Sequence, residues 1–193
     1  ENSPIEIESQ SDAEILNAPE EPKKMTFLEA DEGKGNVDYS KGGMYQANCQ
    51  AAVLIHEAGL RGLDITALPY DDAPGSWNKV LGAHTNFGWE NPQNGKYPHL
   101  KEVEGKESEL AVWINNNTKN VGRYHIGIDR ITGDGHILTA DRRRNGELRL
   151  YDPQDGNFYS LQDFITGGVK IQLLRVDELL FNKDALLAIS RLL

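Results

Sequence analysis

Residues 48–62 read Asn48-Cys49-Gln50-Ala51-Ala52-Val53-Leu54-Ile55-His56-Glu57-Ala58-Gly59-Leu60-Arg61-Gly62. Apolar side chains recur in this stretch at the i, i+3, i+4, i+7 spacing of one helical face, beginning at Ala51. Asn48 is a good N-cap residue, because its side-chain oxygen can accept a hydrogen bond from an amide of the first turn, and Gly62 is a good stop. The stretch therefore predicts a helix whose first residue is Cys49, and we expect the fold to be organised around it.

Cys49 is the only cysteine of the chain. At the start of a helix, unpaired N–H groups and the helix dipole stabilise negative charge, which favours the reactive thiolate form of a cysteine. The alternative from the position alone is a small buried side chain, since free cysteines are among the most buried residues. A single cysteine excludes an intramolecular disulfide and a cysteine-based metal cluster, and we expect neither a metal site nor a cofactor.

The 193 residues carry a formal net charge of −10, and most of that charge lies at the start of the chain. Residues 1–35 contain ten acidic and three basic residues, and prolines interrupt them. This composition predicts an acidic tail or linker, followed by one domain over residues 36–193. The domain is nearly neutral, which argues against a nucleic-acid-binding surface, and no apolar run is long enough for a membrane span.

The first part of the predicted domain combines regular and irregular segments. Residues 63–69 alternate apolar and polar side chains and predict a short strand that ends at a proline. Residues 70–100 are rich in glycine, proline and aromatic residues, and they predict a packed, irregular segment that either rims a substrate cleft or caps the core. Residues 105–118 predict a helix with one apolar face.

Four later segments have the alternating pattern of strands. The first is expected to be half exposed. The second and third are expected to form a hairpin, because Asn145-Gly146 between them is a strong turn signal. A helical turn is expected at residues 161–165 and a closing helix at residues 183–193. The four strands cover residues 121–131, 136–141, 147–152 and 169–176. Helices followed by an antiparallel meander define an α+β fold.

A cysteine nucleophile needs a base and a group that orients the base, close in space rather than in sequence. His136 stands at the start of a predicted strand, after a glycine-rich turn, where a side chain can lean into a cleft. His125, within the preceding strand, is the competing base, or else a histidine on the strand surface. His56 lies two turns along the cysteine helix and cannot easily reach back to the thiol. The pattern favours His136.

The orienting carboxylate depends on the register of the predicted hairpin. A two-residue turn at Asn145-Gly146 would place His136 opposite Asp155, whereas a longer loop over residues 142–146 would place it opposite Asp152. Residues directly opposite one another share a face of the sheet, so either carboxylate could reach the imidazole. Asp155 lies beyond a proline, where strand pairing should have ended, and we therefore prefer Asp152.

Three side-chain amides are candidates for an oxyanion hole or for substrate binding. Gln46 and Asn48 stand just before the nucleophile, and either could assist the backbone N–H of Cys49. Gln154 follows the predicted orienter and could line the site. The alternatives are a capping role for Asn48 and a turn-capping role for Gln154.

Asn48-Cys49 at a helix start, Gly135-His136 at a strand start and Asp152-Pro153-Gln154-Asp155-Gly156 after the next strand together carry a family resemblance. Over residues 36–176 the chain resembles the papain-fold toxin domain of bacterial polymorphic toxins, a group related to the effector glutamine deamidases. The resemblance implies a papain-like α+β fold, with an N-terminal nucleophile helix packed on an antiparallel sheet. It also implies that Cys49, His136 and Asp152 act as nucleophile, base and orienter.

The function implied by the resemblance is protein glutamine deamidation of the toxin or effector type. Peptide-bond cleavage by a cysteine protease with the same three residues is an alternative, and so is a non-catalytic papain-like binding module of a larger phage or secretion-linked protein. The implied partners are a protein substrate in a target cell and, as a candidate, an immunity protein. The acidic and polar residues from Glu1 onward predict no classical signal peptide. We expect it to be cut from a longer protein, or delivered by a secretion system, and to act in the target-cell cytoplasm.

Overall fold

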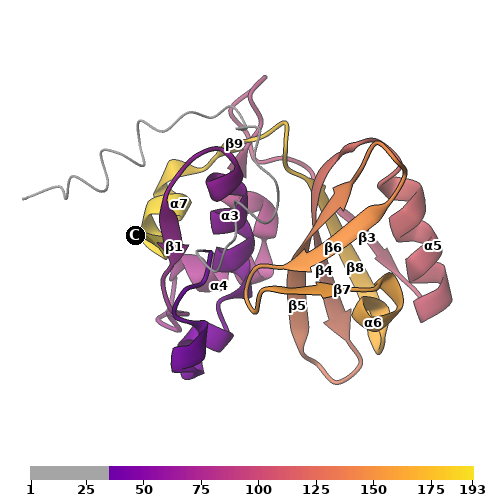
Figure 1. The fold of residues 1–193 in the computed structure, drawn as a ribbon, viewed down its shortest axis with the longest axis horizontal. Helices are drawn as coiled ribbons and strands as arrows, with labels where there is room; N and C mark the ends of the chain where they lie inside the picture. Colours follow the sequence, from indigo (N-terminus) through magenta and orange to yellow (C-terminus); the bar gives the residue numbers. More distant parts are fainter. Residues whose placement is uncertain (1–34) are drawn as a thin grey trace, which may run out of the picture.

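The computed structural model describes residues 35–193, so the expected acidic tail lies outside the described residues except for Gly35. A six-stranded antiparallel sheet forms the centre of the fold, with helices on both faces (Figure 1). In spatial order its strands are β3 (Lys101–Glu104), β8 (Gly168–Arg175), β4 (Gly122–Arg130), β5 (Gly135–Arg142), β6 (Leu148–Asp152) and β7 (Asn157–Tyr159).

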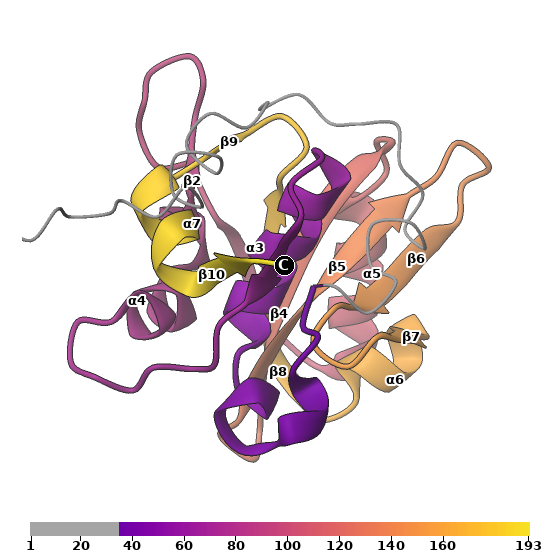
Figure 2. The ribbon, with the colours of Figure 1, turned by 60° about the vertical axis from the view of Figure 1, so that its left-hand side comes forward.

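The helices divide between the two faces of the sheet. On one side lie α3 (Cys49–Leu60), α4 (Trp77–Ala83) and α7 (Lys183–Ile189), and on the other α5 (Glu107–Asn117) and α6 (Leu161–Ile165) (Figure 1). Figure 2 shows α3 in front of β4 and β5. Among residues 35–193, none of the helices has the length and apolar character that crossing a membrane would require. The expected α+β fold, with a nucleophile helix packed on an antiparallel sheet, is confirmed.

Short elements complete the layer around α3. They are the 3₁₀ helices η1 (Tyr39–Lys41), η2 (Gly43–Gln46) and η3 (Thr85–Gly88) and two small antiparallel pairs, β1 (Ile65–Ala67) with β10 (Ser190–Leu192) and β2 (Trp89–Glu90) with β9 (Leu180–Phe181). The closing helix ends earlier than the sequence predicts, because the last residues leave it at Ser190 to pair with β1.

Each face of the sheet has its own apolar core. Leu54 and Ile55 of α3, together with α7, form the core on one face, and the apolar side of α5 and α6 forms the other. Strand β4 therefore has cover on both faces, and five consecutive residues from Tyr124 to Ile128 are buried. The prediction of a half-exposed strand here is wrong, because alternation in one sequence does not reveal that a second layer covers the polar positions.

The segment 70–100 is more regular than predicted. It contains α4, which begins after Ser76, whose hydroxyl accepts a hydrogen bond from the Lys79 backbone N–H at 3.2 Å. It also contains Trp89, which is fully buried and stacks on Phe181 with ring centroids 5.0 Å apart. Glycines and prolines hide these elements in the sequence, because a helix of two turns leaves too short a periodic pattern.

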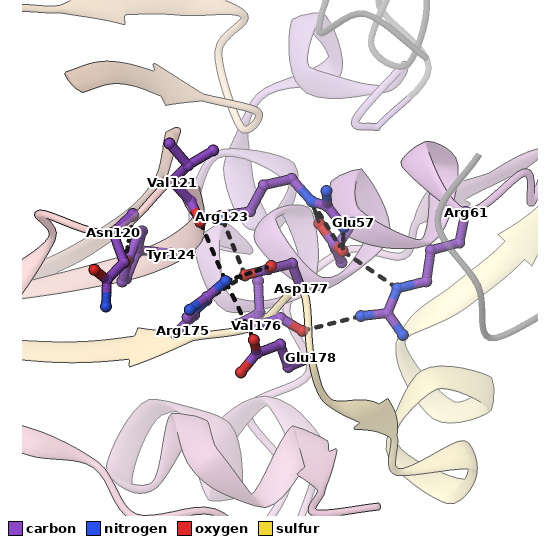
Figure 3. Close-up of polar contacts among 10 residues, drawn as sticks. All are labelled: Glu57, Arg61, Asn120, Val121, Arg123, Tyr124, Arg175, Val176, Asp177 and Glu178. Carbon is purple, nitrogen blue, oxygen red and sulfur yellow. Dashed lines mark hydrogen bonds and ion pairs between the residues drawn. The ribbon is translucent and has the colours of Figure 1, made fainter. Parts of the chain in front are cut away.

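Buried charges anchor the last turns of α3 to the sheet (Figure 3). The carboxylate of Glu57, 1% exposed, accepts from Arg123 of β4 at 2.6 Å and from Arg61 at 3.2 Å. Arg61 also donates to the carbonyl oxygens of Val176 and Leu179, at 3.0 and 2.6 Å. Because removing one partner of a buried pair leaves an uncompensated charge, this network holds α3 in one position on the sheet.

Candidate active site

Cys49 is the first residue of α3, as predicted, and its free thiol is half buried. The first backbone hydrogen bond of the helix runs from the Ala52 N–H to the Asn48 carbonyl, at 3.0 Å. Within the described chain no side chain caps this helix start, so the predicted capping by the Asn48 side chain is wrong. The first-turn amides, including those of Cys49 and Gln50, are therefore left for a thiolate or for a ligand oxygen.

His136 and Asp152 meet at the ends of β5 and β6. The Nε2 atom of His136 lies 2.5 Å from Oδ2 of Asp152, a carboxylate that is 2% exposed. The same imidazole shares a hydrogen bond with the side chain of Cys49. Burial lowers the pKa of His136, but the hydrogen bonds and charges of Asp152 and Cys49 outweigh it and raise the pKa from 6.5 to about 10. The imidazole is thus held as a cation beside the thiol.

The register of the hairpin differs from both predicted registers. Arg143 pairs with Glu147, through a hydrogen bond of 2.9 Å, and this leaves a three-residue loop that ends at Gly146. Gly146 has a φ of +89°, the left-handed backbone that such loops need at their last position. The loop is therefore one residue longer than a tight turn and shorter than the longer alternative.

This register places Asp152 diagonally from His136. Thr139 lies opposite Tyr151, so the next position along pairs Leu138 with Asp152, on the face of the sheet that His136 shares. Diagonal neighbours in an antiparallel sheet are within reach of long side chains. Asp155 is occupied elsewhere, because its carboxylate accepts from the Asn157 N–H at 2.9 Å and from the Tyr159 hydroxyl at 2.7 Å.

The other two inner histidines belong to the core. His125 and His56 are each 2% exposed. Burial lowers the pKa of each to about 3, with a smaller contribution from the charge of Arg123, so both rings are neutral. His125 packs edge-on against Trp89, with ring centroids 5.6 Å apart, and does not line the cavity that contains Cys49. The prediction of a surface position for His125 is wrong, because α3 covers that face of β4.

A cavity of about 350 Å³ opens beside Cys49 and His136. Its walls come from the first turn of α3, from Asn78 and its neighbours on α4, and from Asp129 and Gln172 on the sheet. The segment 70–100 thus supplies a wall, the role expected of a segment that rims a cleft. The described residues include no group of His, Cys, Asp and Glu side chains able to hold a metal ion.

The three candidate side-chain amides lie in different environments. Gln46 is exposed, donates to the Tyr39 carbonyl at 3.3 Å and does not line the cavity. Asn48 is buried, and its Oδ1 accepts from Nε2 of Gln154 at 3.4 Å while its Nδ2 donates to the Leu68 carbonyl at 3.0 Å. Asn48 and Gln154 therefore join the helix start to the segment after β6.

Asn36 completes this link and was missed by sequence reasoning. It is 6% exposed, its Oδ1 accepts from Nδ2 of Asn48 at 3.0 Å, and its Nδ2 donates to the Gln154 carbonyl at 2.9 Å. Gln154 in turn donates its backbone N–H to Oδ1 of Asp152, at 2.9 Å. We call Asn36, Asn48 and Gln154 the amide clamp. No sequence signal marks Asn36, which follows directly on the acidic segment.

One sequence family and one solved structure are similar to the chain. The sequence model of the family described as "Papain fold toxin 1, glutamine deamidase" matches residues 47–157, more than half of the chain. Among solved structures, the chain is similar to the crystal structure of the Pseudomonas avirulence protein AvrPphB, with 13% identity, a TM-score of 0.39, and coverage of 83% of this chain and 98% of that chain. That likeness is too low to support an argument about the site. No curated protein matches the chain.

Proposed function

The chain belongs to the papain fold toxin 1, glutamine deamidase family, and from that premise we propose that it deamidates a glutamine side chain of a protein in a target cell. One observation supports the assignment of this reaction to Cys49, His136 and Asp152. The imidazole of His136 bonds Asp152 through Nε2 at 2.5 Å and meets the side chain of Cys49 at the same time. A nucleophile, a proton carrier and an orienting carboxylate in contact are the minimum that thiol-dependent amide hydrolysis requires.

In the proposed first step, the thiolate of Cys49 attacks the carbonyl carbon of the substrate carboxamide. A C–S bond forms, and the negative charge on the oxygen is stabilised by the first-turn amides of α3. When the C–N bond breaks, the imidazolium of His136 gives its proton to the leaving nitrogen, and ammonia departs. The raised pKa of His136, about 10, keeps that proton available at neutral pH.

In the second step, the neutral His136 takes a proton from water, and the resulting hydroxide attacks the thioester. A C–O bond forms, the C–S bond breaks, and glutamate leaves with the thiolate of Cys49 restored. Asp152 does not change its protonation state. It holds the ring of His136 in one orientation and stabilises the imidazolium in both steps.

The proposal includes delivery and protection. Membership of a toxin family fits a domain that a secretion system, or a larger secreted protein, carries into the target cell. An enzyme that modifies a common cell protein also endangers the cell that makes it. We therefore include an immunity protein as a partner of the chain.

Mass spectrometry of target-cell proteins tests the proposal. Proteins are exposed to the wild type or to Cys49→Ala, and ammonia release is measured in parallel. We expect ammonia and one glutamine converted to glutamate on an uncut protein, with the wild type only. Discrete cleavage fragments seen only with the wild type would replace the deamidase by a cysteine protease. Binding of a target protein without either change would indicate a non-catalytic module.

A further inference from the structure

Asn78 presents an unused hydrogen-bond donor to the cavity. The residue is 6% exposed, and its Oδ1 accepts from the Asp71 backbone N–H at 3.1 Å. Since a backbone N–H can only donate, the accepting atom must be the amide oxygen, which fixes the orientation of the side chain. Among residues 35–193, Nδ2 of Asn78 has no hydrogen-bond partner, although the residue lines the cavity with Cys49. Within the described part of the chain, Nδ2 of Asn78 is not one of the fully buried side-chain atoms that lack a partner, so this nitrogen is open to the cavity, where a ligand oxygen can replace water as its acceptor.

Gln172 presents the complementary group from the sheet. Its Nε2 donates to the Glu102 carboxylate at 3.0 Å. A carboxylate can only accept from it, so the orientation of this amide is fixed as well, and Oε1 is turned away from Glu102. That oxygen lies 3.3 Å from the point where a Cβ would stand on Gly127, and both residues line the cavity. An acceptor therefore faces the space that the glycine leaves open.

The charged groups that line the cavity do not favour a charged ligand. Lys79 and Asp129 line it with opposite signs and are exposed, and the imidazolium of His136 is paired with the carboxylate of Asp152. Asn78, which is buried, and Gln172, which is partly buried, line the cavity with neutral amides. A neutral substrate group that offers both an acceptor and a donor is the best match to this lining.

A primary carboxamide is such a group, because it carries a carbonyl oxygen and an NH₂. We propose that Asn78 and Gln172 select it: Nδ2 of Asn78 donates to the carbonyl oxygen, and Oε1 of Gln172 accepts from the NH₂. The inference rests on the proposed function and names the substrate group taken at its site. A scissile peptide bond also carries a C=O and one N–H, and it differs from a primary carboxamide in having a carbon in place of the second N–H.

Three thiol reagents test the proposal without a known protein target. Iodoacetamide contains a primary carboxamide, its N,N-dimethyl analogue keeps only the carbonyl acceptor, and methyl methanethiosulfonate lacks an amide. Each reacts with Cys49, and each rate is divided by that of a free cysteine peptide. Ratios between reagents cancel any change in the reactivity of the thiolate itself. We expect the wild type to favour iodoacetamide over both other reagents.

The variants separate the two contacts. Asn78→Asp keeps the acceptor for the Asp71 N–H and removes the donor, and Asn78→Leu removes the donor without adding charge. In both variants, the rates of reaction with the two amide reagents should fall by about tenfold relative to the rate with methyl methanethiosulfonate. This is the change expected from the loss of one hydrogen bond. Gln172→Met should lower the relative rate of reaction with iodoacetamide and leave that of the N,N-dimethyl analogue unchanged. Lys79→Gln, on the same helix, is the matched control and should change no ratio.

Thermal melts establish that each variant is folded, and either Asn78 variant suffices if the other unfolds. Unchanged ratios in a folded Asn78 variant would overturn the proposal, even if the wild type releases ammonia from target-cell proteins. Conversely, an iodoacetamide preference that depends on Asn78, in a wild type that cleaves proteins, would support carboxamide binding and reject the proposed function. A loss of preference in Lys79→Gln of the same size would also overturn it, because the effect would then not be specific to the two amides.

Discussion

Replacing Asp152 by asparagine should leave the fold intact and reverse the tautomer of His136. The Gln154 backbone N–H donates to Oδ1 of Asp152 at 2.9 Å, so the substituted side chain must keep its oxygen there. Its NH₂ then takes the place of Oδ2, which lies 2.5 Å from Nε2 of His136. An NH₂ donates, so the ring must accept at Nε2 and carry its proton on Nδ1. The nitrogen that faces Cys49 can then no longer accept a proton from water in the second step.

The size of the effect follows from the pKa of His136. The pKa is raised from 6.5 to about 10, and at about 1.36 kcal/mol per unit this is roughly 5 kcal/mol in favour of the imidazolium. Asp152 and Cys49 share that contribution against the opposing effect of burial. A hydrogen bond between charged groups contributes about 1.5–3 kcal/mol, which corresponds to roughly ten- to a hundredfold in rate. The wrong tautomer adds to the loss, and comparable triads lose up to about ten-thousandfold. We therefore expect a loss between these limits.

Ammonia release from target-cell proteins measures the loss, with Asp155→Asn as the matched control. The pH dependence of the Tm is a second test of the role of Asp152. Because the pKa of His136 is raised on folding, its contacts stabilise the fold fully below pH 6.5 and lose that effect as the pH rises through about 10. The Tm difference between the wild type and Asp152→Asn should thus be largest below pH 6.5. Activity within tenfold of the wild type, or an equal loss in Asp155→Asn, would refute the reasoning.

Three further perturbations test the site and its support. His136→Ala should abolish ammonia release and slow alkylation of the thiol, whereas His125→Ala should lower the Tm with little change in alkylation; the reverse pattern would contradict the assignment of the base. Glu57→Gln removes one partner of a buried ion pair, which costs about 3–5 kcal/mol, and it should lower the Tm by about 10 °C, whereas Glu147→Gln, in an exposed pair, should change it by under 3 °C in thermal melts. Asn36→Ala should lower ammonia release more than tenfold at a modest cost in Tm, and unchanged turnover would show that the amide clamp does not position the thiol.

The parts of the fold with long periodic patterns could be predicted from the sequence. Helix α3, helix α5 and the inner strands each contain enough residues for a period to be visible, and the position of Cys49 follows from the first of them. Edge strands β3 and β7 could not be predicted in the same way. They span four and three residues, and their side chains are mostly exposed. Short exposed strands form because a neighbouring strand offers hydrogen bonds, which no local pattern records.

The site could be predicted only as far as residue types allow. The sequence predicts Cys49 at a helix start, His136 at a strand start and Asp152 at a strand end. The predicted strand register that places His136 relative to Asp152 is wrong. Asn78 and Asn36 could not be found, because a neutral amide has many structural uses and only its partners reveal which one applies. The hydrogen bonds that fix their roles come from residues 7 and 12 or more positions away in the chain.

The distribution of charge along α3 has a chemical consequence. Glu57 and Arg61 lie two to three turns from Cys49, so about 12 Å separates Glu57 from the thiol along the helix. At that distance a unit charge acts on the thiol with about 1.4 kcal/mol, compared with about 4 kcal/mol at contact, for an effective dielectric constant of 20. The opposite charges of Glu57 and Arg61 reduce it further. Near Cys49 the helix is held instead by the neutral amide clamp. The fold thus fixes Cys49 with strong ionic contacts at the far end of α3 and with uncharged contacts at the near end.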